Sequence, residues 1–240
     1  MGKKEKEGYP FAKLEDSNLF GQSSEFYGIS GDDNTIIRKS FVGEDDPCRN
    51  RKKITTADRV RDFEIKIVEF RKILERCGIH SAKTDYVIGA DPINGVPSIF
   101  CVTDRVEGET LGELKSLSKE TIGTMDGIYA KMIDELLDSY EQDGYFWYDI
   151  KNDQFMYGIA PGDTGANLYL IDTDPNVFKW DDPDMEKESG LNRRQMLDNR
   201  LRNIAAEILG LESVVDEKKS AFPKTREKLG QAGIKIRPIS

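Results

Sequence analysis

The sequence predicts an α+β protein with two lobes, the first rich in β-strands and the second mainly helical. Short apolar runs separated by glycine and other turn residues indicate five antiparallel strands and one helix within residues 18–106. Longer stretches with helical spacing dominate residues 107–240, where they are interrupted by one hairpin pattern. A charged segment, residues 1–17, comes before the first lobe. The predicted lobes therefore meet near Glu107.

Composition sets broad limits on function. The 240 residues are 38% hydrophobic, which is enough for a core in one compact unit or in two lobes. Acidic residues outnumber basic ones by 44 to 35, and a net charge of −9 lacks the electrostatic pattern of a nucleic-acid-binding protein. The charged start has no apolar stretch behind it, so we expect neither a secretory signal nor a membrane anchor. We expect a cytoplasmic location, with export by a signal-independent route left open.

The cysteines and the single histidine do not suggest a metal or triad site. Cys48, Cys77 and Cys101 lack the paired spacing of a zinc site or a disulfide framework, so we expect reduced thiols. Chemistry based on a Ser-His-Asp triad or on histidine ligands would depend on His80 alone. Because His80 comes just after a predicted helix, we expect a solvated loop residue.

The strands of the first lobe are marked by the turns between them. Residues 18–41 consist of short apolar runs broken by glycine and by a Gly-Asp-Asp-Asn turn at residues 31–34, which is typical of an antiparallel meander. Two further strands are predicted at residues 86–88 and 98–102. A strong turn cluster at residues 91–95 separates them.

Two long helices are predicted from apolar spacing. The first begins at Thr55 or Thr56, either of which can cap it, and Gly78 is well placed to end it. Its apolar residues are Phe63, Ile67, Phe70, Leu74 and Cys77. The second begins after Ser118 and ends at Gly144. Its apolar stripe requires burial and comprises Ile122, Met125, Ile128, Met132, Leu136 and Tyr140.

A hairpin and a third helix complete the second lobe. Residues 154–159 and 167–171 are predicted to form two strands around a turn at residues 161–165. Residues 196–210 predict a helix whose apolar face contains Leu197, Leu201, Ile204 and Ile208. The residues after this helix are polar and lysine-rich, and they predict no element.

Two aspartates flank the predicted hairpin. Asp149 precedes the loop that leads into the first strand, and Asp172 ends the return strand. Side chains at these positions face each other across the mouth of the hairpin, where they can share a cation or position a hydroxyl. The hairpin is therefore the predicted site of chemistry.

The residues around both aspartates resemble a known family. Residues 148–154, YDIKNDQ, are similar to the catalytic loop of protein kinases, D-[LI]-K-x-x-N, and of aminoglycoside phosphotransferases, D-L-H-x-x-N. Residues 170–174, LIDTD, resemble their metal-binding step. The chain thus resembles a divergent member of the protein kinase-like superfamily, which implies a bilobal fold. The resemblance also implies that Asp149 orients or deprotonates the acceptor hydroxyl, that Lys151 meets the transferred phosphate and that Asp172 binds magnesium.

Two positions depart from the pattern of the family. Gln154 stands where the family has its metal-binding asparagine, and its amide oxygen is the same type of ligand on a longer side chain. Because magnesium requires near-octahedral geometry, Gln154 predicts an altered second metal site. Trp147 stands where the family has a structural histidine.

A lysine in an N-terminal strand completes the predicted phosphate site. Residues 36–39, IIRK, resemble the V-A-I-K strand, whose lysine holds the α- and β-phosphates of ATP. Lys39 is the predicted ligand, with Arg38 on the opposite face of the strand as the alternative. In the family this lysine pairs with a helix glutamate, for which Glu69 is preferred and Glu64 is the alternative.

The glycine-rich loop of the family is only partly present. Residues 21–28 keep the first glycine of G-x-G-x-x-G and place serine and phenylalanine at the later positions. The resemblance implies that Gly21 and Ser23 approach the phosphates through backbone N–H groups and the hydroxyl.

A predicted hinge follows the last strand of the first lobe. Residues 100–111 resemble the family segment in which a strand gives way to E-G-x-x-L. In the family the backbone of this strand holds the adenine edge, which by position corresponds to Asp104, Arg105 and Val106.

The resemblance implies an ATP- and Mg²⁺-dependent phosphotransferase that transfers the γ-phosphate to a hydroxyl. Lys151 is the protein-kinase choice and slightly favours a protein acceptor. The absence of an A-P-E motif after Asp172 instead resembles small-molecule kinases, of the aminoglycoside or choline type, and compact atypical protein kinases. A different class is a pseudokinase, a nucleotide-binding or scaffold module in which Gln154, Trp147 and the altered glycine loop mark lost catalysis. We expect no nucleic-acid or membrane partner.

Overall fold

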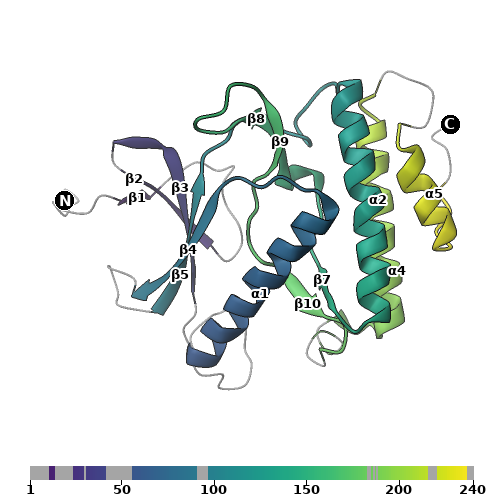
Figure 1. Cartoon of the computed structure of the whole chain (residues 1–240), viewed down its shortest axis with the longest axis horizontal. Helices are drawn as coiled ribbons and strands as arrows, with labels where there is room; N and C mark the ends of the chain where they lie inside the picture. The colour runs from purple at the N-terminus through teal and green to yellow at the C-terminus, as the bar shows by residue number, and fades with distance from the viewer. Residues whose placement is uncertain are drawn as a thin grey trace, which may run out of the picture. The chain divides into compact units, whose positions relative to one another are not determined.

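The computed structural model describes residues 11–13, 24–29, 31–41, 56–90, 97–182, 185, 187, 189–215 and 221–236. The chain divides into two compact units. The first comprises Met1–Phe63, Ala82–Glu107 and Ile159–Thr164, and the second comprises Glu64–Ser81, Gly108–Gly158 and Gly165–Ser240. Figure 1 gives the element labels that are used below. One boundary between the units falls beside Glu107, where the two predicted lobes meet.

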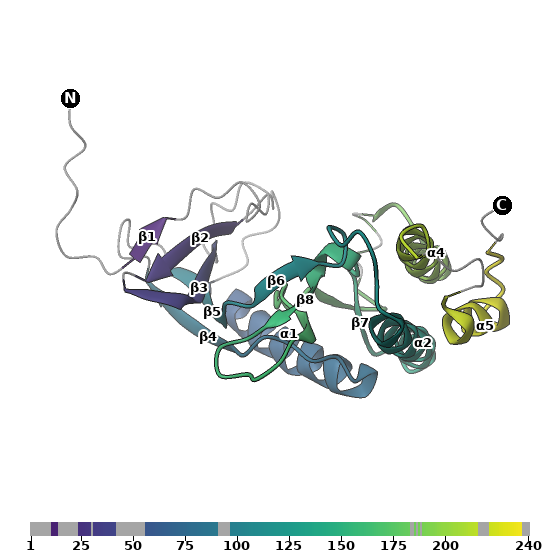
Figure 2. The ribbon, with the colours of Figure 1, turned by 90° about the horizontal axis from the view of Figure 1, so that it is seen from above.

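The first unit carries a five-stranded antiparallel sheet (Figures 1 and 2). Its first strand lies at residues 11–13, in the charged segment that was predicted to precede the lobe, so the described part of residues 18–106 supplies four strands and the prediction of five there is corrected. Its strand order is β1-β2-β3-β5-β4. The strands are β1 (Phe11–Lys13), β2 (Ser24–Ile29), β3 (Asp32–Phe41), β4 (Thr84–Ala90) and β5 (Pro97–Asp104). Each pair of neighbours is antiparallel. The predicted turn at residues 91–95 lies outside the described residues.

The turn between β2 and β3 is shorter than the sequence predicts. Gly31 has φ +82°, so one glycine supplies the left-handed conformation that the reversal needs. β3 therefore begins at Asp32, which corrects the prediction of a turn through residue 34. The carboxylate of Asp32 accepts hydrogen bonds from Asn34 N at 2.9 Å and Thr35 Oγ1 at 2.7 Å. These bonds satisfy the polar residues at the start of the strand, so they need not form a loop.

Helix α1 (Thr56–Cys77) has the predicted bounds and a glycine-dependent end. Gly78 has φ +68°, and Ile79 N donates to Leu74 O at 2.8 Å, as in the common left-handed helix terminus. Within the second unit, α1 buries a stripe formed by Phe70, Ile73, Leu74 and Cys77.

The second unit is mainly helical, with two small sheets. Its helices are α2 (Lys119–Glu141), α4 (Arg193–Glu212) and α5 (Pro223–Gln231). One sheet has the order β6-β8-β9, with β6 (Glu107–Thr110), β8 (Phe155–Ile159) and β9 (Asn167–Leu170). β8 and β9 pair antiparallel, so the predicted hairpin is confirmed. The other sheet pairs β7 (Tyr145–Trp147) with β10 (Val177–Lys179).

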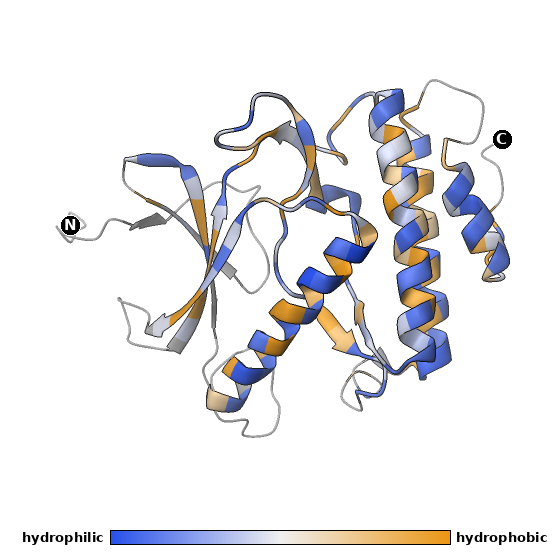
Figure 3. Ribbon diagram, viewed as in Figure 1, coloured by the Kyte–Doolittle hydropathy of each residue, from blue (hydrophilic) through white to orange (hydrophobic). Residues whose placement is uncertain are grey.

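Helix α2 is the centre of the core of this unit. It packs against α4, α5 and β7, and Figures 1 and 2 show α2 and α4 side by side. The predicted stripe is confirmed, with Met125 0% and Leu136 3% exposed. In Figure 3 apolar bands alternate with polar ones along α2 and α4, as helices with one buried face require. None of the described helices is long and apolar enough to cross a membrane.

The end of α2 and the start of α4 differ from the prediction, and one helix was not predicted. α2 ends at Glu141, before Gly144, because Asp143 takes φ 53° and already reverses the chain. α4 begins at Arg193, earlier than residue 196, because Asn192 and Gln195 form a capping box. α5 was not predicted, although Pro223 stands at its start, where proline is well tolerated.

A buried carboxylate joins α2 to α5. Asp126 is 3% exposed, and it accepts hydrogen bonds from Lys224 N at 3.2 Å, from Thr225 N at 2.9 Å and from Thr225 Oγ1 at 2.8 Å. These donors include backbone N–H groups of the first turn of α5, which have no partner within the helix. Asp126 thus caps a helix that is distant from it in the sequence.

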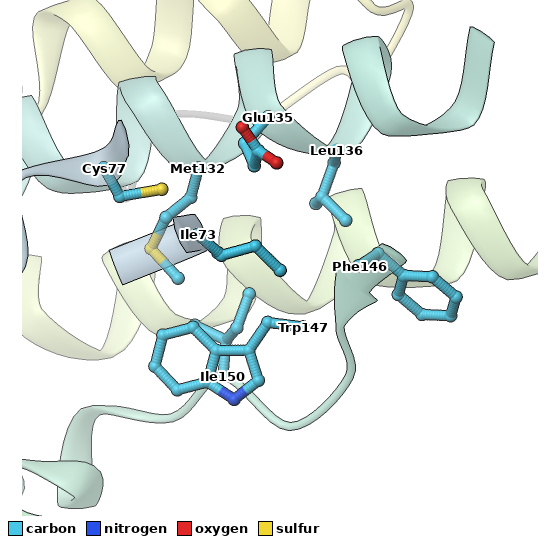
Figure 4. A pocket seen from close by; sticks show the side chains of 8 residues that line it. All are labelled: Ile73, Cys77, Met132, Glu135, Leu136, Phe146, Trp147 and Ile150. Atoms are coloured by element: carbon cyan, nitrogen blue, oxygen red, sulfur yellow. The ribbon is translucent and has the colours of Figure 1, made fainter. Parts of the chain in front are cut away.

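A small apolar pocket lies among α1, α2 and β7 in the second unit (Figure 4). Its lining consists of Ile73, Cys77, Met132, Glu135, Leu136, Phe146, Trp147 and Ile150.

Burial raises the pKa of the Cys77 thiol to about 12. Cys77 and Cys101 are both free thiols, as predicted, and Cys48 lies outside the described residues.

We predict that Asp126→Ala lowers the free energy of unfolding by about 2–4 kcal/mol, because it leaves the backbone N–H groups of Lys224 and Thr225 without their acceptor, while the Thr225 hydroxyl keeps Asp126 O. Asp134→Ala is the matched control on the same helix, since Asp134 pairs with Lys228 of α5 at an exposed position. We expect a much smaller loss there. Urea unfolding followed by tryptophan fluorescence checks this, because both tryptophans lie in the second unit. Equal losses in the two variants would contradict the capping role.

We also predict that Cys77 resists alkylation in the folded protein at pH 8, because its pKa of about 12 leaves almost no thiolate. The measurement is the rate of iodoacetamide labelling in a variant whose other two cysteines are serine. Labelling should accelerate strongly in denaturant. A native rate equal to the denatured rate would contradict burial of this thiol.

Candidate functional site

Two short strands bring the predicted aspartate segments together. β7 pairs with β10 through the register Trp147–Val177, and Tyr148 N donates to Asn176 O at 2.9 Å. Asp149 lies just after β7, and Asp172 lies shortly before β10. Trp147 is 3% exposed and meets Phe70 edge to face, with ring centroids 5.4 Å apart. The residue at the position of the family's histidine is therefore a core residue here.

Asp149 pairs directly with Lys151. Lys151 Nζ lies 3.0 Å from Asp149 Oδ2, and the side chains are 52% and 32% exposed. The hydrogen bond to Asp149 is the main cause that raises the pKa of Lys151. Two predicted site residues thus form one ion pair that solvent can reach. We call residues 148–154 the candidate loop.

Gln154 joins the candidate loop to Asp172. It is 7% exposed; its Oε1 accepts from Lys151 N at 3.0 Å, and its Nε2 donates to Asp172 Oδ2 at 3.3 Å. The backbone adds a bond from Ile171 N to Gln154 O at 2.9 Å. A continuous set of contacts therefore runs from Asp149 through Lys151 and Gln154 to Asp172.

The oxygens of this site suit a hard cation. Asp172 accepts from Asp174 N at 3.2 Å through Oδ1 and from Gln154 through Oδ2, and a carboxylate oxygen has a further lone pair. The described residues contain no group of three acids, cysteines or histidines placed to bind a metal. The donors fit a magnesium ion that takes its other ligands from phosphate oxygens and water. The role of Gln154 as a metal ligand stays a prediction, because its amide oxygen is also engaged by Lys151 N.

Side chains of α2 and α4 form hydrogen bonds with Asn152 of the candidate loop. Asn152 is 8% exposed, and its Oδ1 accepts from Tyr129 OH of α2 at 2.6 Å. Asn152 N donates to Glu207 Oε2 of α4 at 2.7 Å, and Asn152 Nδ2 donates to Glu207 O at 2.9 Å. Burial raises the pKa of Tyr129 and that of Glu207. The loop is thus bonded to two helices through one asparagine.

An arginine of α4 holds the start of the candidate loop. Arg200 Nη1 donates to Tyr148 O at 2.5 Å, and its guanidinium lies 3.9 Å from the centroid of the Tyr148 ring. Arg200 is 8% exposed, and burial lowers its pKa. Neither Arg200 nor Glu207 was predicted as a site residue. The available signal was a charged residue on the predicted apolar face, since Arg200 lies between Leu197 and Ile204 on that face.

The remaining charged residues predicted for the nucleotide site stay predictions. Lys39 lies in β3, where its backbone pairs with Glu25 and Phe100, but its side chain is not among the described residues. Glu69 accepts a hydrogen bond from Lys72 Nζ at 2.8 Å. Gly21 and Ser23 lie outside the described residues.

The predicted hinge residues differ in their backbone contacts. Asp104 N donates to Lys83 O at 2.9 Å, and Arg105 N donates to Asn34 O at 2.6 Å. These two N–H groups are therefore occupied within the first unit. Among the described residues, Val106 N donates to no backbone oxygen, and its contact with a base stays a prediction.

Comparison with known proteins gives structural similarity only. No protein-family model matches the chain, and no curated protein sequence matches it. The structure is similar to a Rio2 kinase–ADP/Mg²⁺–phosphoaspartate complex from Chaetomium thermophilum, with TM-score 0.41, 12% identity, and coverage of 94% of this chain and 66% of that chain. It is also similar to the MAP kinase LmaMPK10 from Leishmania major, with TM-score 0.40, 12% identity, and coverage of 91% of this chain and 61% of that one. Both of those proteins are named as kinases.

We predict that Gln154→Glu lowers the free energy of unfolding at pH 7, in metal-free buffer, by about 2 kcal/mol or more. The variant loses an N–H donor to Asp172 and places a second carboxylate beside it. Urea unfolding provides the measurement.

The matched control for this variant is Gln195→Glu. Gln195 Oε1 also accepts a backbone N–H bond in a capping box, from Asn192 N at 2.9 Å, but in the first turn of α4. A carboxylate is favourable there, so stability should be unchanged or higher. A loss of the same size in both variants would contradict the bridge from Gln154 to Asp172.

Proposed function

We propose that this protein is an ATP- and Mg²⁺-dependent phosphotransferase of the protein kinase-like class that transfers the γ-phosphate to a hydroxyl group. The proposal depends on one observation above all. Asp149 and Asp172 belong to one unit and are connected through Lys151 and Gln154 by contacts of 3.0, 3.0 and 3.3 Å. Phosphoryl transfer requires an acid that positions the acceptor and another that holds a metal, both kept in fixed relation.

Each residue of the proposed site has one task. Asp149 aligns the acceptor hydroxyl and accepts its proton, while Asp172 would hold the magnesium, with Gln154 as a proposed second contact. Bound magnesium supplies positive charge that stabilises the phosphate oxygens. The ammonium of Lys151 pairs with Asp149 at 3.0 Å, and we propose that it contacts the phosphate during transfer.

The proposal assigns the nucleotide contacts to residues of the first unit. Lys39 would neutralise the α- and β-phosphates, and its proposed partner, Glu69, belongs to the second unit. Val106 N would donate to the adenine edge, since Asp104 N and Arg105 N already donate within the unit. Gly21 and Ser23 remain proposed phosphate contacts from the altered glycine loop.

We propose a protein as the acceptor, because Lys151 follows Asp149 at the protein-kinase position and pairs with it. A small aminoglycoside- or choline-type molecule is the alternative acceptor. A screen of protein and amino-sugar acceptors with labelled ATP separates these two, since only the true acceptor becomes labelled.

A pseudokinase is the second candidate, and one observation favours it. Gln154 directs its Nε2 hydrogens toward Asp172, and its oxygen is engaged by Lys151 N. If this arrangement persists with nucleotide bound, the second metal contact is lost and only binding remains. A thermal shift with ATP and no transfer would identify this case, because binding to the folded state raises its stability.

We predict that Asp149→Ala and Asp172→Ala each reduce phosphate transfer from labelled ATP by at least about a hundredfold. Asp153→Ala is the matched control, because it removes an exposed carboxylate from the same loop. Its activity should stay near that of the unmodified protein. Equal activity in the unmodified protein and both site variants would contradict the proposed function.

A further inference from the structure

Helix α4 presents two oppositely charged side chains to the candidate loop. Arg200 donates to Tyr148 O, and Glu207 accepts from Asn152 N, so they contact the loop before and after Asp149. They are seven residues apart, which is about two turns or 10 Å along one face of the helix. A cation meets a carbonyl oxygen and an anion meets an N–H group, so each charge matches the dipole of its peptide partner.

Arg200 is buried and Glu207 is half-buried, and the nearest opposite charges, Asp149 and Lys151, act on them only through space. Within the described part of the chain, Arg200 and Glu207 form no ion pair, and Nε of Arg200 is buried without a hydrogen-bond acceptor. Burial of a charge is costly unless it is paired or strongly hydrogen-bonded. The main polar contacts that offset this cost are with the candidate loop itself.

The contacts fix the peptide group that carries Asp149. Tyr148 O and Asp149 N belong to one planar peptide unit, so the bond from Arg200 sets the orientation of the Asp149 backbone. The stacked Tyr148 ring prevents Arg200 from rotating away. At the other end, Glu207 and Tyr129 hold Asn152, leaving Asp149 and Lys151 between two anchored points.

We propose that Arg200 and Glu207 are positioning residues that hold the candidate loop in the conformation that presents Asp149. This inference rests on the proposed function for the role of Asp149 in transfer. We call the contacts of Arg200 and Glu207 with the candidate loop the clamp. Their effect on the loop can be tested separately from that function.

The experiment compares Arg200→Met, Arg200→Lys, Glu207→Ala and Glu207→Gln in the full chain. Two readouts are used: hydrogen–deuterium exchange of residues 148–154, and kcat and KM for ATP in phosphate transfer. Arg193→Met and Glu212→Gln are the matched controls on α4. Arg193 also stacks on a tyrosine, Tyr140, at 4.3 Å, and Glu212 pairs with Arg226 away from the loop.

We predict that Arg200→Met and Glu207→Ala accelerate exchange in the candidate loop and lower kcat by about a hundredfold, with KM for ATP little changed. Arg200→Lys and Glu207→Gln keep a donor and an acceptor, so they should recover part of both readouts. The two control variants should leave both readouts near those of the unmodified protein.

Loop exchange unchanged in Arg200→Met and Glu207→Ala would overturn the proposal. Exchange that rises as much in the core of α2 as in the loop would also overturn it, because that pattern reports general destabilisation. If the unmodified protein transfers no phosphate, the proposed function fails while the clamp is still judged by exchange. Faster exchange confined to the loop would then support the clamp alone.

Discussion

The candidate loop depends on one constraint: its buried polar groups must find partners within the folded chain. Asn152 and Gln154 are almost fully buried, and an unpaired polar group at such a place costs about 1–3 kcal/mol. Their amides bond instead to Tyr129, Glu207, Lys151 and Asp172. Helices α2 and α4 must therefore pack correctly before the loop takes its shape. The conformation of the candidate site thus depends on the packing of the hydrophobic core.

The same constraint explains the unusual role of Gln154. A side chain one methylene longer than asparagine reaches back to Lys151 N and still donates to Asp172. Gln154 Oε1 accepts from the backbone N–H of Lys151 just before the turn of residues 152–154, which is the glutamine half of a capping box. In the sequence, Gln154 predicts an altered metal site. In the structure, its two hydrogen bonds order the candidate loop. Ordering of the acids and ligation of a metal are therefore separate properties of this position.

Much of the fold was predictable because its elements repeat a pattern. Four of the five strands, α1 and the β8–β9 hairpin follow from alternation, turn residues and caps that lie close together in the sequence, whereas β1 lies in a segment predicted to precede the sheet. β7 and β10 have three residues each, too few for any period to be visible. α5 is short and polar, with only Thr225 and Leu229 buried within it, so no apolar stripe marks it.

The candidate site was predictable only in part for a similar reason. Asp149, Lys151, Gln154 and Asp172 lie within a recognisable motif, and the structure connects them. Arg200 and Glu207 act through tertiary contacts with residues about fifty positions away, which no local pattern encodes. The direction of the Gln154 amide also depends on its surroundings. Motifs predicted the acids, whereas the residues that hold them had to be found in three dimensions.

The cap that Asp126 provides for α5 has a consequence for folding kinetics. Its partner Thr225 is 99 residues away, so the contact closes a long loop and forms only after the chain has explored many arrangements. Until α5 docks, the carboxylate of Asp126 on α2 lacks the hydrogen-bond donors that Lys224 and Thr225 supply. We therefore expect α5 to dock late in folding, although it is distant in sequence from the proposed chemistry.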